Sequence, residues 1–393
     1  MVSDAVLQRP LAWRDPSLIP MLAQLQGNIL KGHGRAHTRN LFLRFGAQPA
    51  RARRALADLA HTITSAIEQL SASVRYRADG TSGGPVCFLF LSAAGYHALG
   101  VADTFIPTDT AFREGMAARG PRLGDPAAEQ WDAAFRTSVH ALLLIGADSG
   151  AEADGETARI VAALAAGGID VVAVERGTAS GKCGPRGPNE DHLGQPSGSQ
   201  PLMLTDDVAG VDTANGGTFG WDPTFGPGQL ALVRDPGNAN EDAFGSYLVF
   251  RKLEENVAAF DRAERGLALT SEAALPAGAH ACAPAGLAIA ANDRWGSEAS
   301  CAGSVHRFHA DPAIDRARLM PRRTIAYGAS TGTADSAGLL FMTYNQDIAR
   351  QFEFVQSHAS CACGGATRMR GGDYFFAPSI GFLTGLSDGL GPR

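Results

Sequence analysis

The feature that most constrains the fold of this 393-residue chain is an alternation of strand-like and helical segments that occurs twice. In the N-terminal half, four apolar runs predict strands at 40–45, 86–91, 140–145 and 171–175. Between the first two runs, one helical face carries five apolar residues: Leu56, Leu59, Ile63, Ile67 and Leu70. An Ala-rich helix is predicted at 156–166, where Gly167 and Gly168 end it. The order strand–helix–strand, strand–helix–strand predicts a ferredoxin-like unit.

The C-terminal half repeats this scheme. Its predicted elements are a strand at 246–253, a helix at 254–264, a strand at 339–344, a helix at 345–356 and a strand at 374–377. We therefore expect two similar α+β halves, 1–200 and 201–393, whose antiparallel sheets pack together. Two domains also agree with the length. A Gly-, Pro- and Ser-rich stretch at 178–230 and an irregular insertion at 270–330 are long, and loops of this length are usually functional or disordered.

Charge and hydropathy exclude several classes of function. The net charge is -6 and no basic block is present, which argues against binding to nucleic acid or to an anionic membrane surface. No apolar run reaches the roughly 18 residues of a membrane-spanning helix. The segment Met1–Ala5 does not open an export signal, which predicts a cytoplasmic protein, although export by another route stays open.

The six cysteines do not predict a disulfide scaffold in a chain of this length. Cys87 lies in an apolar run and is expected in the core. Cys361 and Cys363, with His358 nearby, offer a metal clip, but a structural zinc site needs four ligands. The alternative is a Gly-rich loop that carries two free thiols or one local redox pair.

Five segments of the chain resemble, in order, blocks of the dye-decolorising (DyP-type) haem peroxidases. They are LQGNILKGHG at 25–34, FGSYLVFRKL at 244–253, GLLF at 338–341, DIARQFEFVQ at 347–356 and GDYFFAPS at 372–379. The matches cover nearly the whole chain. The resemblance implies two ferredoxin-like halves, a haem pocket mainly in the C-terminal half, and a peroxidase that uses hydrogen peroxide and an organic electron donor.

The haem ligand that the resemblance implies is His306. The segment His306–Pro312 is similar to the family's "HIRKANPR", and its spacing from histidine to proline selects His306 over the competing His309. His306 would then bind the iron of one haem b. A coordinating imidazole also needs an acceptor for its second nitrogen, and Asp347 or Glu353 could provide it.

On the opposite side of the haem, the resemblance implies an arginine. The segment Pro321–Gly328 is similar to the family's "RRG..YG", with Thr324 in place of the usual glycine. Arg322 takes the first position of the pair and would stabilise charge on the leaving oxygen of peroxide. Leu339 and Phe341 are expected in the wall of the haem pocket.

The main departure from the family lies at 191–201, which is similar to its GxxDG motif followed by "SQP". Gly194 and Gly198 keep the spacing and are expected beside the haem, but Ser197 stands where the family has its aspartate. A serine hydroxyl is not a base near neutral pH, and the loss of a general base typically costs ~10² to 10⁴ in rate. Two alternatives to a missing base stay open. In another alignment Asp191 takes the position of the family's aspartate, or His192 acts as the base instead.

Two functions follow. The first is a haem peroxidase that oxidises bulky dye- or phenol-like donors, with electrons passing through a surface aromatic residue. The candidates for that residue are Trp221, Trp295, Tyr344 and Tyr374, although each such ring is more often packed in the core than used as an electron relay. The second is a haem-binding, carrying or sensing protein with little peroxidase activity because of Ser197. A third reading, in which the pocket binds another small molecule, conflicts with the retention of both His306 and Arg322. Exposed sheet faces would also allow a homo-oligomer.

Overall fold

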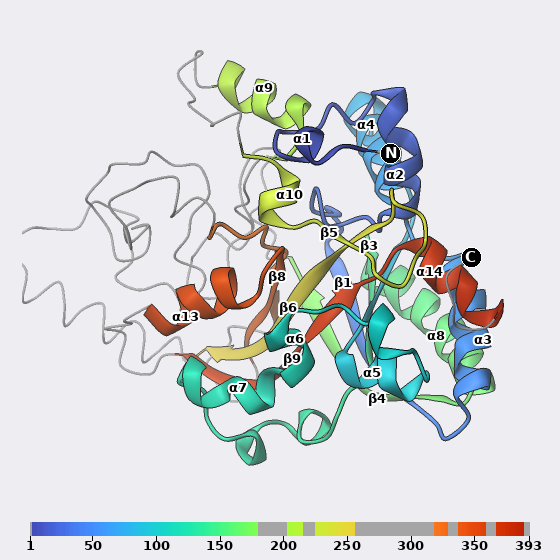
Figure 1. Cartoon of the computed structure of the whole chain (residues 1–393), viewed down its shortest axis with the longest axis vertical. Coiled ribbons are helices and arrows are strands. Elements are labelled where there is room, and N and C mark those ends of the chain that lie inside the picture. The colour runs from blue at the N-terminus through green and yellow to red at the C-terminus, as the bar shows by residue number, and fades with distance from the viewer. Residues whose placement is uncertain are drawn as a thin grey trace, which may run out of the picture.

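The computed structural model describes residues 2–179, 203–214, 225–255, 318–328, 337–358 and 367–388 (Figure 1). The strands of the N-terminal half are β1 (His37–Phe45), β2 (Val86–Leu91), β3 (Ala141–Ala147) and β4 (Ile169–Thr178). Those that follow are β5 (Val233–Arg234), β6 (Phe244–Glu255), β7 (Ile325–Tyr327), β8 (Gly338–Asn345) and β9 (Thr367–Ala377). The expected boundary between Gln200 and Pro201 lies outside the described residues.

The longer helices belong to the N-terminal half: α3 (Pro49–Ala60), α4 (Ala66–Asp79) and α8 (Gly150–Ala166). The shorter ones are α1 (Asp4–Leu7), α2 (Ile19–Gln24), α5 (Ala93–Ala98), α6 (Thr110–Glu114), α7 (Met116–Leu123), α9 (Thr205–Ala214), α10 (Pro227–Leu230), α13 (Phe354–His358) and α14 (Ile380–Gly385). A π-helical turn, η5 (Ala349–Glu353), precedes α13. Single 3-10 turns occur at Pro16–Leu18, Asp103–Phe105, Ala128–Gln130, Ala133–Phe135 and Leu386–Asp388.

Both halves have the same strand topology. The sheet runs in the order β4-β1-β3-β2-β9-β6-β8-β7, and every neighbouring pair is antiparallel. Each half therefore places its four main strands in the order fourth, first, third, second, as in a ferredoxin-like unit. The prediction of an α+β fold with two such halves is confirmed.

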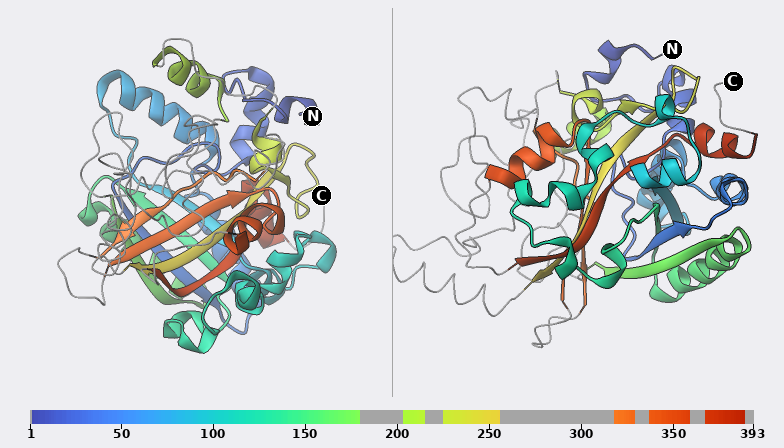
Figure 2. Two further views of the ribbon diagram at one scale, coloured as in Figure 1. Left: turned by 90° about the vertical axis from the view of Figure 1, so that its left-hand side faces the viewer. Right: turned by 60° about the horizontal axis from the view of Figure 1, so that its bottom comes forward.

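The two half-sheets face each other and also meet at their edges. Figure 2 (left) shows the strands of one half in front of those of the other. The ring of Phe42 in β1 lies 4.9 Å from that of Phe250 in β6, so the core fills the space between the sheets. At one edge, β2 pairs with β9 only through Leu91 and Phe376. At the other, a Cβ on Gly177 of β4 would come within 2.5 Å of Ile325 in β7.

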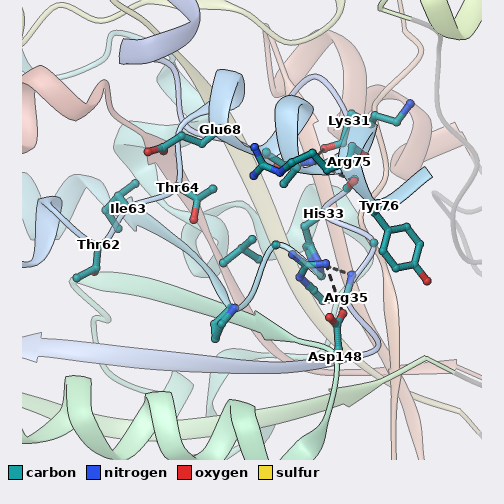
Figure 3. A pocket seen from close by; sticks show the side chains of 18 of the residues that line it. Lys31, His33, Arg35, Thr62, Ile63, Thr64, Glu68, Arg75, Tyr76 and Asp148 are labelled. Atoms are coloured by element: carbon teal, nitrogen blue, oxygen red, sulfur yellow. Dashed lines mark hydrogen bonds and ion pairs between the residues drawn. The ribbon is translucent and has the colours of Figure 1, made fainter. Parts of the chain in front are cut away.

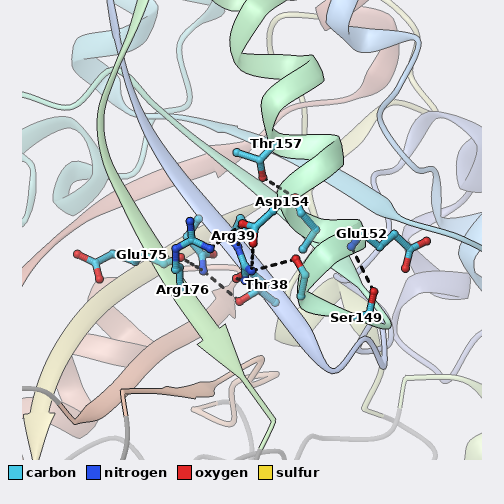
Figure 4. Close-up of polar contacts among 11 residues, drawn as sticks. Thr38, Arg39, Ser149, Glu152, Asp154, Thr157, Glu175 and Arg176 are labelled. Carbon is cyan, nitrogen blue, oxygen red and sulfur yellow. Dashed lines mark hydrogen bonds and ion pairs between the residues drawn. The ribbon is translucent and has the colours of Figure 1, made fainter.

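Charged side chains hold α8 on the outer face of the N-terminal sheet (Figure 4). The guanidinium of Arg39 in β1 donates to both carboxylate oxygens of Asp154 in α8, at 2.8 and 3.1 Å. Arg176 in β4 donates to the same carboxylate at 2.6 Å. These two guanidinium groups hold the pKa of Asp154 well below its usual range. Helix α8 is thus tied to two neighbouring strands.

The structure differs from the sequence prediction in three elements. The single apolar face at 56–70 belongs to two helices, because Ser65 begins α4 with a capping box that involves Glu68. β6 continues to Glu255, where a helix was predicted from 254, and the residues that follow are not described. The helix predicted from Asn345 begins at Ala349 as a π-helical turn, since Asn345 still belongs to β8.

No helix in the described part of the chain combines the length and the apolar character that crossing a membrane requires.

Candidate active site

Three of the residues expected at the haem pocket lie on one face of the C-terminal sheet. β7 pairs with β8 in a register that matches Ile325 with Leu340, and the same register continues to an isolated bridge between Arg322 and Thr343. Directly opposed residues of an antiparallel pair point to the same face, and alternate residues of a strand share it. Arg322, Thr343, Phe341 and Leu339 therefore share one face. Each is at least nine-tenths buried.

The neighbouring arginine points to the opposite face. Arg323 donates from Nε to the backbone oxygen of Asn28 and from a terminal nitrogen to that of Ile29, both at 2.7 Å. A third bond, of 2.9 Å, reaches the backbone oxygen of Arg322. Burial lowers the pKa of Arg323 to about 10, so the group remains a cation near neutral pH. Arg323 fastens the N-terminal segment to the strand, and Arg322 is the member of the pair on the face of Leu339 and Phe341.

Aromatic rings cover this face. The ring of Phe352, in η5, lies 6.1 Å from that of Phe341 and 6.2 Å from that of Tyr374 in β9. The guanidinium of Arg251, opposite Phe341 in β6, lies 5.5 Å from the Phe352 ring centre. π-Helical turns occur often at functional sites. The expected pocket thus has an apolar, water-excluding wall with two buried arginines, Arg322 and Arg251, beside it.

A buried carboxylate is anchored next to this wall. Glu353 pairs with Arg119 of α7 through both of its oxygens, and the Tyr374 hydroxyl donates to the same carboxylate at 2.9 Å. Burial, first, and Glu353, second, raise the pKa of Tyr374. Asp347, the other expected acceptor, is only half-buried and instead accepts the backbone N–H of Arg350.

The sequence did not reveal which side chains pair with Glu353 and Arg251. Arg119 lies in a Gly- and Pro-containing stretch that gave no helical signal, yet α7 carries it to Glu353, 234 residues away in the sequence. A second buried pair joins Arg251 to Asp125. The signal that the sequence offered was the placement of a charged residue, Arg251, directly after the apolar run Tyr247–Phe250 of a strand.

Two of the proposed surface aromatic residues are not at the surface. Tyr344 and Tyr374 are both fully buried, because β8 and β9 are covered on both faces. Of the two roles that the sequence left open for these tyrosines, core packing is therefore the observed one, and neither is a surface relay.

Most of the remaining expected residues lie outside the described residues. These are Ser197, His192, Gly194, Gly198, His306, His309, Asp191, Trp221, Trp295, Cys361 and Cys363. Within the described ranges, no group of three or more His, Cys, Asp or Glu residues is placed to hold a metal ion.

A separate cavity of about 530 Å³ lies in the N-terminal half (Figure 3). Its lining comes from residues 31–86 and Asp148, and it includes none of the expected site residues. His33 in this lining accepts the backbone N–H of Arg35 at 2.9 Å. Burial, with Arg35 and Arg323 nearby, lowers the pKa of His33 to about 3. This histidine is therefore neutral near pH 7 and unsuited to proton transfer there.

Comparison with known proteins identifies the family. Residues 24–179 match the family model described as the DyP dimeric alpha+beta barrel domain. The multifunctional dye peroxidase DyP2 of Amycolatopsis sp. is 31% identical over 468 residues, which cover 97% of this chain and 99% of the relative. The chain belongs to the DyP-type peroxidase family.

Solved structures agree with this assignment. The DyP-type peroxidase of Anabaena sp. superposes with a TM-score of 0.84 at 28% identity and covers 98% of this chain and 100% of its own. DyP2 from Amycolatopsis sp. gives a TM-score of 0.81 at 28% identity, with 96% and 99% covered. The chain is an enzyme of the DyP type, and DyP peroxidases are haem enzymes.

Proposed function

We propose that this enzyme uses one haem b, held by His306, to reduce hydrogen peroxide and to oxidise bulky dye- or phenol-like donors. The observation that supports the proposal best is the shared face of Arg322, Leu339 and Phe341, which follows from the β7–β8 register. A flat apolar group fits against the Leu339 and Phe341 side chains, and Arg322 lies beside it. The described residues therefore fit the distal side of a haem.

A bound haem would supply the redox-active iron. The chain's own contribution begins with Arg322, whose guanidinium would stabilise negative charge on the departing peroxide oxygen. Its burial strengthens this effect, because water screens a buried charge less. Leu339, Phe341 and Phe352 would exclude water from the reacting atoms.

Proton transfer is the step in which this enzyme would differ from its family. Ser197 would hold the position of the family's aspartate without its basicity. His192, because an imidazole can accept a proton near neutral pH, or a water molecule would then move the proton from one peroxide oxygen to the other. Gly194 and Gly198 would let the loop backbone approach the haem.

On the other side of the haem, we infer that Glu353 rather than Asp347 accepts the second imidazole N–H of His306. Glu353 is buried, and two partners hold its carboxylate in place. A fixed carboxylate of this kind orients a ligating imidazole and raises its basicity.

The second candidate function is a haem-binding or haem-carrying protein with little activity, and the Ser197 substitution favours it. Localisation in the cytoplasm and association into a homo-oligomer stay predictions from the sequence.

Absorption spectra of the haem-loaded protein after mixing with a small excess of hydrogen peroxide separate the two candidates. A peroxidase should change its Soret band within seconds. Arg322→Leu should slow this change by about 10² to 10³ while retaining haem. Exposed Arg54 in α3 gives the matched control, Arg54→Leu, which should react like the wild type.

A haem carrier should instead keep a stable Soret band that peroxide bleaches slowly, and Ser197→Asp should then create turnover. His306→Ala should lose haem, whereas His309→Ala should keep it. An unchanged reaction in Arg322→Leu would reject the assigned role of this arginine.

A further inference from the structure

A small cavity opens where the two half-sheets separate. β2 and β9 pair only at Leu91 and Phe376, and the cavity of about 230 Å³ lies next to this point. Ser92, Ala93 and Ala94, which follow β2, line one side, and Gly372 and Asp373 of β9 line another. None of the residues assigned to the haem pocket lines it except Tyr374, whose ring lies across β9.

Asp373 presents an unused acceptor to this cavity. Its Oδ1 accepts the backbone N–H groups of Met116, at 3.1 Å, and Tyr374, at 2.9 Å. Its Oδ2 has no partner among the described residues, and it is not sealed from solvent. A ligand hydroxyl that donates to this half-buried carboxylate oxygen would form a charge-assisted hydrogen bond, which is stronger than one between neutral groups.

The other charged groups of the lining are mostly occupied. Arg113 binds the carboxylate of Asp103 and three backbone oxygens, and Glu114 pairs with Arg119. In the ranges that the structure describes, the Arg136 guanidinium makes one hydrogen bond, from its Nε to the backbone oxygen of Trp131 at 2.7 Å. Its positive charge at the rim disfavours an ammonium ligand and leaves a neutral donor as the better match for Asp373.

The rest of the wall suits one aromatic ring. Phe112, Trp131 and Phe135 contribute rings to the lining, and Ala93, Ala94 and Ala117 contribute small apolar groups. Drug-sized ligands occupy pockets of about 300–1,000 Å³, so a cavity of 230 Å³ accommodates a single substituted ring.

We propose that this cavity binds a single-ring phenol whose hydroxyl donates to Asp373. The role of that phenol as an electron donor rests on the proposed peroxidase function, whereas its binding does not. Asp373 and Tyr374 point to opposite faces of β9, so a phenol in the cavity would be separated by one strand from the Tyr374, Phe352 and Phe341 rings.

Isothermal titration of the haem-loaded protein tests the proposal with two matched probes. Guaiacol (2-methoxyphenol) carries the hydroxyl, and 1,2-dimethoxybenzene replaces it by an ether that donates no hydrogen bond. Guaiacol should bind at least tenfold more tightly. Asp373→Asn keeps an oxygen for the two backbone N–H groups and should weaken guaiacol binding at least tenfold. Asp58→Asn, an exposed change in α3, should leave it unaltered.

Ala94→Leu provides a second variant that fills the cavity without touching the carboxylate, and it should also weaken guaiacol binding at least tenfold. If Asp373→Asn does not fold, guaiacol binding to Ala94→Leu tests the proposal in its place. Absence of guaiacol binding to the wild type, equal binding of the two probes, or unaltered binding to both cavity variants would overturn the proposal. The peroxide reaction without any donor, measured on the same wild-type sample, reports separately on the proposed function.

Discussion

Arg323 and Asn28, 295 residues apart in the sequence, are joined by a buried hydrogen bond of 2.7 Å from the guanidinium Nε to the backbone oxygen. Asn28 has a φ of 65°, a left-handed conformation that asparagine tolerates better than most residues. Its side chain accepts the His33 backbone N–H and donates to the Tyr344 hydroxyl. The segment 25–34, the first of the blocks that resemble the family, therefore supports the extended segment that carries Arg322.

We predict that Arg323→Met lowers the free energy of unfolding by about 2–4 kcal/mol, because three buried backbone oxygens lose their donor. Arg323→Lys should cost less but should not restore full stability, since an ammonium does not reproduce the fork of donors. Urea unfolding followed by circular dichroism measures both. Arg54→Met is the control on an exposed helix position, and a loss as large as that of Arg323→Met would contradict this account.

The buried pair of Arg251 and Asp125 gives a second prediction. Both side chains are 4% exposed, and the second oxygen of Asp125 has no hydrogen-bond partner within the described part of the chain. Arg251→Met should destabilise the fold by about 3–5 kcal/mol because it leaves a buried carboxylate uncompensated.

The double variant Asp125→Leu/Arg251→Met removes both charges and should be more stable than Arg251→Met alone. A double-mutant cycle from urea unfolding measures the coupling. If the losses in the free energy of unfolding from the two single variants simply add up in the double variant, the pairing of Arg251 with Asp125 does not cause the destabilisation.

The apolar runs of the sequence predicted the strands of both halves, because a buried strand has a recognisable length and composition. The choice of Arg322, Leu339 and Phe341 for the haem pocket came from the family resemblance. That these three residues share one face follows only from the pairing register, since neighbouring residues of a strand point to opposite faces. The pairing of Arg119 with Glu353 was equally hidden, because a contact between distant segments leaves no local pattern.

The Glu353 carboxylate gives a prediction that distinguishes how much each of its two partners, Arg119 and Tyr374, contributes to stability. Tyr374→Phe removes one hydrogen bond but keeps the ring beside Phe352, so it should cost about 1 kcal/mol of stability. Glu353→Gln weakens the pairing with buried Arg119 and should cost about 2–4 kcal/mol. Denaturant midpoints of the two variants provide the comparison, and equal losses would contradict the assignment of the main role to Arg119.

Asp373 should make stability depend on pH in a direction opposite to that of most carboxylates. Burial raises its pKa from 3.8 to about 6, so the folded protein binds this proton more tightly than the unfolded chain does. The contribution of Asp373 to stability is therefore fully present below about pH 4, the region of its unfolded pKa, and is lost as the pH rises through about 6.

Asp373→Asn abolishes this titration. The free energy of unfolding of the wild type, relative to that of the variant, should fall by about 1–2 kcal/mol between pH 4 and pH 7, less than the full shift would give because solvent reaches one carboxylate oxygen. Urea unfolding of both proteins at each pH measures this difference, with Asp58→Asn as an exposed control. A difference that stays constant with pH would mean that Asp373 ionises in the fold as easily as in the unfolded chain.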